Sequence, residues 1–188
     1  MQAAAVILAA GGSTRFGSPK QLARLGDRTM LETVIELAHR AGLAPVVAVV
    51  PAGMATLAGV LPVANEEPQA GLSRSLRLGL AAVPPKVGAA LILLGDQPTV
   101  PAGTLLALIE GAASTGRPVV ASMADGRIGA PVLIARDAFW LADEATGDEG
   151  LRRILDAHPE LVSTVEVGGH APDVDTPADL AALGQESR

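Results

Sequence analysis

Short uncharged apolar runs that alternate with amphipathic segments are the feature that most constrains the fold of this chain. Each run is apolar at consecutive positions instead of alternate ones, which is typical of strands in a parallel sheet covered on both faces. The runs occupy residues 4–9, 46–50, 89–94, 119–123 and 132–135, and Val63 and Ala64 indicate one further short strand. A sheet of this kind needs helices on both of its sides.

Helical patterns fill the intervals between these runs. The clearest covers residues 30–40, where Leu31, Val34 and Ile35 share one face and Thr29 with Glu32 forms a capping-box motif. Further helices are predicted at residues 72–82, 102–113, 137–142, 151–157 and 177–183. This alternation predicts an α/β fold, a three-layer α/β/α sandwich with a mostly parallel sheet, and we expect residues 1–188 to form a single domain. Ligands of such folds bind beyond the carboxyl ends of the strands.

Composition excludes several classes of function. The chain contains no cysteine, which rules out thiolate nucleophiles, cysteine-bound zinc and disulfides. Its formal net charge is −6 and aromatic residues make up only 2% of it, so we expect no nucleic-acid partner.

One long uncharged stretch, residues 41–65, has the length of a membrane span. Its proline and glycine residues divide it into pieces that predict two buried strands with a short helix between them, so we expect no membrane partner. The apolar start of the chain lacks the basic residues that precede the core of a signal peptide. Together these features predict a cytoplasmic protein.

A glycine-rich loop with two basic residues follows the first strand. In the segment AGGSTRFGSPKQL, Gly11, Gly12 and Gly17 let the backbone approach a ligand closely, and Arg15 and Lys20 add positive charge. This composition indicates phosphate binding; the alternative is a flexible turn with solvated charges. The segment contains neither GxGxxG nor a Walker A motif, in which lysine directly follows the last glycine.

Carboxylates stand in two further motifs. Asp96 in LILLGDQP comes directly after a strand, where it is suited to bind Mg²⁺ or, alternatively, to cap a turn. Asp173 and Asp175 lie in PDVDTPADL, and either Asp175 or Thr176 is also a good N-cap for a helix that begins with proline. The three histidines have no metal-ligand spacing, and we expect them to be solvated.

These motifs, in this order, resemble the NTP transferase (molybdopterin nucleotidyltransferase) family, which has the Rossmann-like, nucleotide-diphospho-sugar transferase-like fold. LAAGGSTRFGSPK is similar to the family motif LAAGxSxRxGxxK, and GDQP, GLSRSL and a GD-x-G element are similar to molybdenum cofactor cytidylyltransferases. The resemblance implies Arg15 and Lys20 as catalytic cations and Asp96 with Asp175 as Mg²⁺ ligands, with Asp173 as the alternative second ligand. It implies nucleotide binding by Leu8, Ala9, Ala10, Gly11, Gly12, Ser13, Lys20, Asn65, Gly71 and Ser75, and acceptor binding by Gly129, Pro131, Gly147 and Asp148.

The implied activity is transfer of CMP from CTP to the phosphate of molybdopterin with release of pyrophosphate, and a recipient molybdoenzyme is an implied partner. Ala130 stands where these cytidylyltransferases frequently have histidine, which leaves the acceptor open. Alternatives are the related guanylyltransferases, which usually begin LAGG and have aspartate before the loop lysine, and sugar-phosphate nucleotidyltransferases. A non-catalytic chaperone that delivers the cofactor is the alternative from another class.

Overall fold

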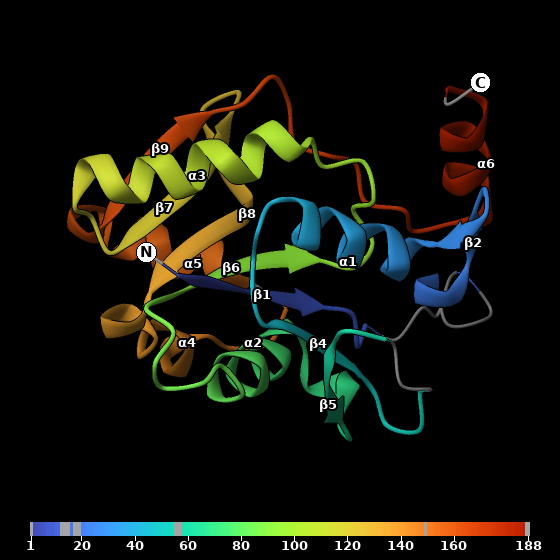
Figure 1. The fold of residues 1–188 in the computed structure, drawn as a ribbon, viewed down its shortest axis with the longest axis horizontal. Helices are drawn as coiled ribbons and strands as arrows, with labels where there is room; N and C mark the ends of the chain where they lie inside the picture. Colours follow the sequence, from blue (N-terminus) through green and yellow to red (C-terminus); the bar gives the residue numbers. More distant parts are fainter. Residues whose placement is uncertain (1, 12–15, 17–19, 55–57, 149, 187–188) are drawn as a thin grey trace.

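The computed structural model describes residues 2–11, 16, 20–54, 58–148 and 150–186. A sheet of 7 strands, in the order β5-β4-β1-β6-β8-β7-β9, forms its centre (Figure 1). The strands are β1 (Ala3–Leu8), β4 (Val46–Pro51), β5 (Leu61–Asn65), β6 (Ala89–Leu94), β7 (Val119–Ala124), β8 (Arg127–Ala135) and β9 (Val162–Glu166). A separate small hairpin joins β2 (Arg24–Leu25) to β3 (Arg28–Thr29).

Strand direction is uniform except in β8. Neighbouring strands pair in parallel across β5, β4, β1 and β6, whereas β8 runs antiparallel to both β6 and β7. A tight turn at Asp125 and Gly126, both with positive φ (50° and 70°), returns the chain directly from β7 into β8. Asp-Gly is a typical sequence for such a turn. The mostly parallel sheet is therefore confirmed, and the apolar run at 132–135 is the exception to parallel pairing.

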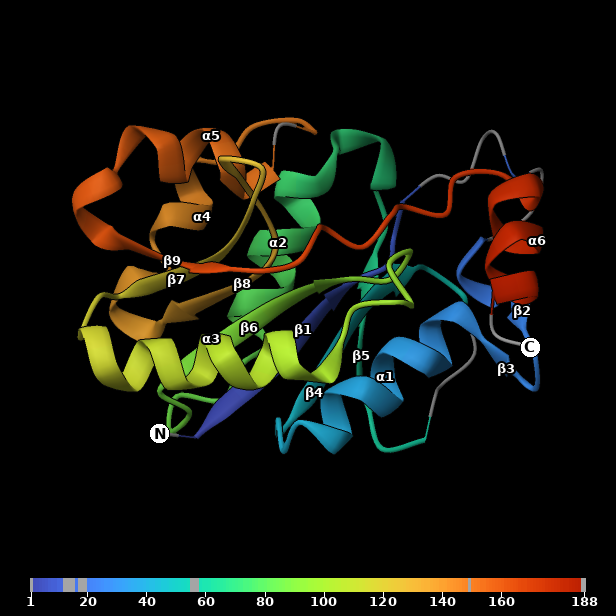
Figure 2. The same cartoon turned by 90° about the horizontal axis from the view of Figure 1, so that it is seen from above.

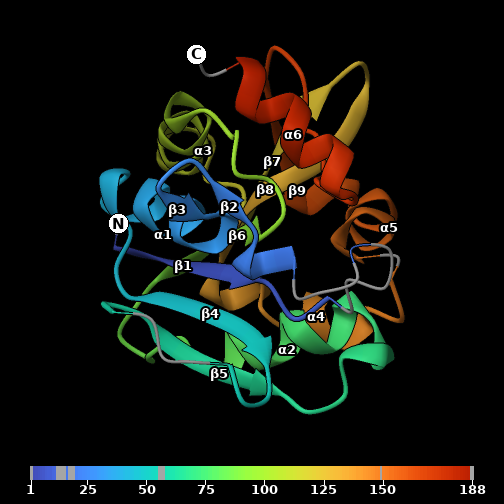
Figure 3. The ribbon, with the colours of Figure 1, turned by 90° about the vertical axis from the view of Figure 1, so that its right-hand side faces the viewer.

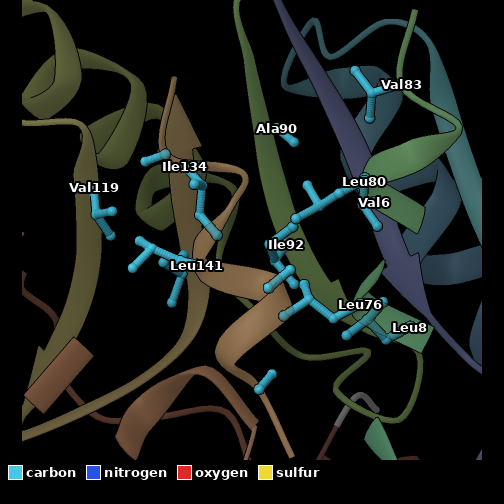
Figure 4. Packing of buried hydrophobic residues seen from close by; sticks show 14 of the residues in the cluster. Val6, Leu8, Leu76, Leu80, Val83, Ala90, Ile92, Val119, Ile134 and Leu141 are labelled. Carbon is cyan, nitrogen blue, oxygen red and sulfur yellow. The ribbon is translucent and has the colours of Figure 1, made fainter. Parts of the chain in front are cut away.

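Helices cover both faces of the sheet, which confirms the expected three layers. Figure 1 shows α1 (Met30–Arg40) and α3 (Ala102–Thr115) on one face, and α2 (Leu72–Ala81) and α4 (Leu141–Glu144) on the other. Leu76, Leu80 and Leu141 pack with Val6 and Ile92 on the second face (Figure 4), and α5 (Gly150–Ala157) contributes to the same cluster. The capping box at the start of α1 is present, with both reciprocal hydrogen bonds.

Two predicted segments differ from the structure. The 137–142 helix begins instead as a 3₁₀ turn, Arg136–Ala138, followed by α4. Of the two strands predicted within 41–65, β4 is buried but β5 is largely exposed, because it is the edge strand of the sheet. The described residues between them, 52–54 and 58–60, include two turns, and residues 55–57 lie outside the described part. Within the described ranges, no helix is both long and apolar enough to cross a membrane.

The carboxyl ends of β1, β4, β5 and β6 meet at one edge of the sheet, and β8 begins there. Figure 3 looks onto this edge. The segment that follows β9 crosses the same edge and leads into α6 (Pro177–Glu186), which lies near the β2–β3 hairpin (Figures 2 and 3). This edge therefore brings together segments from the beginning, middle and end of the sequence.

Candidate active site

Two loops leave the carboxyl ends of the neighbouring strands β1 and β6 and run side by side. The Gly95 amide donates to the Leu8 carbonyl (2.9 Å). A Cβ atom on Gly95 would lie 2.7 Å from the Cβ of Ala9, so this close approach needs a glycine. The contact places Asp96, the next residue, beside the start of the glycine-rich loop.

Lys20 lies between two carboxylates from distant parts of the chain. Its ammonium donates to Asp96 Oδ2 (2.7 Å) and to Asp175 Oδ1 (2.9 Å). The Lys20 side chain is only 12% exposed, whereas those of Asp96 and Asp175 are 23% and 39% exposed. The buried Gln21 side chain donates to the Gly11 carbonyl (3.0 Å), so the residues that flank the glycine-rich loop are held together. The cluster thus unites three motifs that the sequence suggested separately.

The electrostatics of this cluster favour a cation at its centre. Burial lowers the pKa of Lys20, but the hydrogen bonds and negative charges of Asp96 and Asp175 outweigh burial and raise this pKa above its usual value. Asp173 lies nearby, and its Oδ1 accepts from Gln97 Nε2 (2.8 Å). Partial burial of its carboxyl group, and then the charges of Asp96 and Asp175, raise the pKa of Asp173. The carboxylates therefore hold Lys20 protonated and repel one another.

Thr176, and not Asp175, caps helix α6. The Asp179 amide donates to Thr176 Oγ1 (3.2 Å), and the Thr176 amide donates back to Asp179 Oδ2 (2.8 Å). This reciprocal pair is a capping box. The Val174 amide donates to the Asp96 carbonyl (3.0 Å), which fixes the preceding segment against the loop after β6. The Asp175 carboxylate is accordingly directed to Lys20 rather than to the helix.

A cavity of about 360 Å³ opens over the cluster. Its charged lining comes from Lys20, Asp96, Asp148, Asp173 and Asp175. Of the residues that the family resemblance places at the nucleotide, Leu8, Ala9, Gly11 and Lys20 line it, whereas Ala10 is buried in the core. Gly12, Ser13 and Arg15 lie outside the described residues. The rest of the lining comes from Gln21, Leu72, Leu94 and Gly95.

The side chains of Asn65 and Ser75 bind each other instead of facing this cavity. Asn65 Nδ2 donates to Ser75 Oγ (3.0 Å), and Asn65 Oδ1 accepts from the Glu67 amide (3.0 Å) and from Arg74 Nε (3.1 Å). Both residues are buried. They tie the end of β5 to helix α2, and their contact with a nucleotide stays a prediction.

Gly71, Gly147 and Asp148 form a contact between α2 and the loop that precedes α5. The Leu72 amide donates to Asp148 Oδ1 (3.1 Å), and the Ser73 amide donates to the Gly147 carbonyl (3.0 Å). Asp148 therefore caps α2 from a distant part of the sequence, and the negative charge suits the positive end of the helix dipole. Gly71 has φ 90°, and a Cβ there would lie 2.4 Å from the Gly147 carbonyl carbon. Only glycine fits at this point.

The other two predicted acceptor residues lie on β8. Gly129 lines a second cavity, of about 160 Å³ and mainly aliphatic, and a Cβ on it would lie 2.5 Å from the His170 ring. His170 Nε2 lies 2.9 Å from the Arg127 carbonyl, so this partly exposed histidine contacts the strand as well as solvent. Pro131 is buried, and its carbonyl accepts from Ser122 Oγ (2.9 Å). Pro131 thus supports the strand next to the site.

The carboxylate cluster fits a divalent metal that is shared with a substrate. Carboxylate oxygens are ligands that Mg²⁺ and Mn²⁺ prefer, and the Asp96 and Asp175 carboxylates already share one cation, the Lys20 ammonium. Within the part of the chain that the structure describes, no three His, Asp or Glu side chains are grouped as a complete metal site. Asp96 and Asp175 would hold such a metal together with phosphate oxygens, as is usual for Mg²⁺ in nucleotide-dependent enzymes.

Two residues of the site, Gln21 and Gln97, carried no prediction. Gln21 follows directly after Lys20, and Gln97 is the central letter of the DQP string. Their buried amide groups hold the Gly11 carbonyl and the Asp173 carboxylate. In each motif, the glutamine directly follows a charged residue of the predicted site, and this position was the signal that could have pointed to it.

Comparison with known proteins assigns the chain to a family. The model of the MobA-like NTP transferase domain matches residues 5–162. The structure of Rv0371c from Mycobacterium tuberculosis superposes with a TM-score of 0.84 at 30% identity, covering 98% of each chain. A structure of the same protein in complex with manganese superposes with a TM-score of 0.81 at 29% identity, covering 98% of this chain and 99% of that one.

Relatives in sequence agree with this match. A 2-C-methyl-D-erythritol 4-phosphate cytidylyltransferase from Deinococcus radiodurans is 34% identical over 171 residues, which cover 82% of this chain and 68% of the relative. The bifunctional protein GlmU from Staphylococcus carnosus is 32% identical over 116 residues, 58% of this chain but only 26% of the relative. The fold is that of the nucleotide-diphospho-sugar transferases. The chain belongs to the MobA-like NTP transferase family of nucleotidyltransferases.

Proposed function

We propose that this chain transfers CMP from CTP to the phosphate of a molybdopterin-type acceptor and releases pyrophosphate. The observation that carries the proposal is the Lys20 ammonium, held by Asp96 and Asp175 in a cavity at the start of the glycine-rich loop. Nucleotidyl transfer depends on positioning and on stabilisation of phosphate charge, and this cluster is suited to both.

In the proposed reaction an oxygen of the acceptor phosphate attacks the α-phosphorus of CTP. The bond between the α-phosphorus and the bridging oxygen to the β-phosphate breaks, and pyrophosphate leaves with the electron pair. Lys20, together with Arg15, stabilises the charge that develops on the phosphoryl oxygens. Asp96 and Asp175 would hold Mg²⁺, which neutralises triphosphate charge when it is bound. No covalent enzyme intermediate is needed.

Two observations support CTP as the nucleotide. Ala10 and Pro19 stand where the guanylyltransferase branch has glycine and aspartate. The relative from Deinococcus radiodurans is a cytidylyltransferase. A preference for CTP over GTP of tenfold in kcat/KM corresponds to about 1.4 kcal/mol, which one or two hydrogen bonds to the base can supply.

The test measures pyrophosphate release with CTP, GTP, ATP or UTP in the presence of Mg²⁺ and molybdopterin. We expect CTP to exceed GTP at least tenfold in kcat/KM. A preference for GTP would assign the chain to the guanylyltransferase branch, and binding of the cofactor without turnover would assign it a delivery role. A parallel assay tests which acceptor the chain uses. In it, molybdopterin is replaced by 2-C-methyl-D-erythritol 4-phosphate, the substrate named for the Deinococcus relative.

A further inference from the structure

Lys20 occupies the position between Asp96 and Asp175 that a shared metal would need. Its ammonium lies 2.7 Å from Asp96 Oδ2 and 2.9 Å from Asp175 Oδ1, so one oxygen of each carboxylate is directed at the same nitrogen atom. Mg²⁺ binds carboxylate oxygens at about 2.0–2.1 Å. A metal that used these two oxygens together would overlap with the ammonium, and the two cations would repel each other. Only one of them can hold this pair of oxygens at a time.

The backbone of Lys20 is fixed, whereas its side chain is long enough to change partners. The Lys20 carbonyl accepts from the Ala23 amide (3.0 Å), and the Gln21 side chain donates to the Gly11 carbonyl (3.0 Å). The lysine ammonium stands on a flexible four-carbon stem and has three rotatable donors. Lys20 can therefore release the carboxylates by rotation of its side chain, without movement of its backbone or of the sheet.

A triphosphate is the anion that can draw this ammonium away. Lys20, Asp96 and Asp175 all line the charged cavity of about 360 Å³, and among the described residues of its lining Lys20 is the only cation. The neighbouring aliphatic cavity has no lysine in its described lining. The wall that the two cavities share is formed by Leu8, Leu72, Leu94 and Asp148. Phosphate oxygens that enter the charged cavity therefore compete with the two carboxylates for Lys20.

Exchange of partners keeps the charges paired only when metal and triphosphate arrive together. A metal that arrives alone would have to break two charge-assisted hydrogen bonds of a side chain that is only 12% exposed. A triphosphate supplies the ammonium with new acceptors, and the carboxylates of Asp96 and Asp175 then become available to the metal. The metal in turn neutralises these carboxylates and the remaining phosphate charge.

We propose that Lys20 keeps divalent metal off Asp96 and Asp175 until a nucleoside triphosphate binds, so that metal and nucleotide enter the site together. The proposal rests on the metal and triphosphate binding of the proposed function, but it requires no particular base or acceptor. It gives Lys20 a second task before its contact with phosphate. In the nucleotide-free protein, Lys20 is a positioning residue that holds the two carboxylates at a spacing that one cation can bridge.

The direct test measures Mn²⁺ binding without nucleotide, by electron paramagnetic resonance of the free ion. Lys20→Met removes the charge but keeps an unbranched side chain. We expect it to bind Mn²⁺ about tenfold more tightly than the wild type, or better, because two charge-assisted hydrogen bonds no longer have to be broken. Lys20→Arg keeps the charge and should bind Mn²⁺ as weakly as the wild type. Lys86→Met, at an exposed position, is the matched control and should change nothing.

Two further measurements locate the effect. Asp96→Asn in the Lys20→Met background should remove the gained affinity, because it takes away one of the two carboxylates. A saturating CTP analogue with a methylene group in place of the α–β bridging oxygen should largely abolish the difference between the wild type and Lys20→Met, because Lys20 then contacts phosphate. Lys20→Gln, which also lacks the charge, replaces Lys20→Met if melting curves show that Lys20→Met does not fold.

The outcomes separate this proposal from the proposed function. If Lys20→Met binds Mn²⁺ no more tightly than the wild type, or if Lys20→Arg binds it as tightly as Lys20→Met, the exchange is overturned even if CTP is turned over. Tighter binding that depends on Asp96 supports the exchange. If that pattern appears but no nucleotide yields pyrophosphate with any acceptor, the proposed function is wrong and the exchange stands.

Discussion

The two neighbouring cavities are built in opposite ways, although they share a wall. The larger one is defined by charge: Lys20 is held by Asp96 and Asp175, and these three residues come from distant parts of the sequence. The smaller one is defined by shape, because its aliphatic lining comes from the packed faces of α2, α5 and the sheet. Substitutions in the charged cavity should change catalysis more than stability, whereas substitutions in the packed wall should do the reverse.

The largest effect is expected from Asp96→Asn. This change keeps the size of the side chain but removes one of the charges that would hold Mg²⁺ against a triphosphate, so it should abolish metal-dependent turnover. The melting temperature should change little, because the carboxylate is partly exposed. Activity measured over a Mg²⁺ titration provides the test. Wild-type activity with the same metal dependence would remove Asp96 from the metal site.

Lys20→Ala should lower turnover by about 10²–10³-fold, the size of effect seen when one preorganised donor to a transition state is removed. Lys86 is the only other lysine and is exposed, so Lys86→Ala is the matched control for loss of one positive charge. Steady-state kinetics with pyrophosphate detection distinguish the two. A similar, small loss in both variants would contradict the role given to Lys20.

Gly71→Ala tests the contact between the start of α2 and the Gly147–Asp148 loop, which supports the wall of the smaller cavity. The new Cβ would meet the Gly147 backbone at 2.4 Å and would also impose a positive φ on alanine, so we expect a loss of more than ~2 kcal/mol in the free energy of unfolding. Gly116→Ala is the control, because Gly116 also has positive φ (65°) but open space around it. Urea denaturation compares them. Equal losses would mean that backbone strain alone, and not the contact with the Gly147 loop, requires glycine.

Asp175→Asn and Thr176→Ala separate binding from helix capping at adjacent positions. Because Thr176 caps α6, its replacement should reduce the free energy of unfolding by ~1 kcal/mol with activity largely retained. Asp175→Asn should impair turnover and its metal dependence with a smaller loss of stability. Melting curves and Mg²⁺ titrations of both variants form the test. The reverse pattern would assign the cap to Asp175.

The smallest effect is expected at His158, on the surface directly after the end of α5. His158 Nε2 lies 2.9 Å from Glu144 Oε2, and this hydrogen bond, with a further contribution from Glu160, raises the pKa of His158 above 6.5. Because the folded-state pKa is the higher one, the stabilisation is full below the unfolded pKa and is lost as pH rises through the folded pKa. His158→Gln should therefore narrow the difference in melting temperature between mildly acidic and mildly alkaline pH. If the melting temperature of the variant depends on pH in the same way as that of the wild type, His158 does not contribute to the pH dependence of stability.

Local patterns predicted much of the fold. The apolar runs marked β1, β4, β6 and β7, and the Thr29–Glu32 motif placed the start of α1 correctly. These features depend on neighbours in the sequence, which is why they could be recognised. Strand β9 received no prediction, because its residues 162–166, VSTVE, contain only two apolar side chains and form no apolar run. The antiparallel direction of β8 was not predicted, because a buried strand is apolar in either direction, although Asp125–Gly126 indicates a hairpin.

By itself the sequence determined the elements and the chemistry available to them: a glycine-rich loop with a lysine, and carboxylates after a strand and before a helix. Only the tertiary structure decided which of these residues meet. In the folded chain Thr176 caps α6, and the Asp175 carboxylate binds Lys20. Asp148, which is distant in sequence, caps α2. The physical reason is that a cap or an ion pair is decided by distances between atoms, and residues separated by much of the chain come within 3 Å only when the sheet orders its strands.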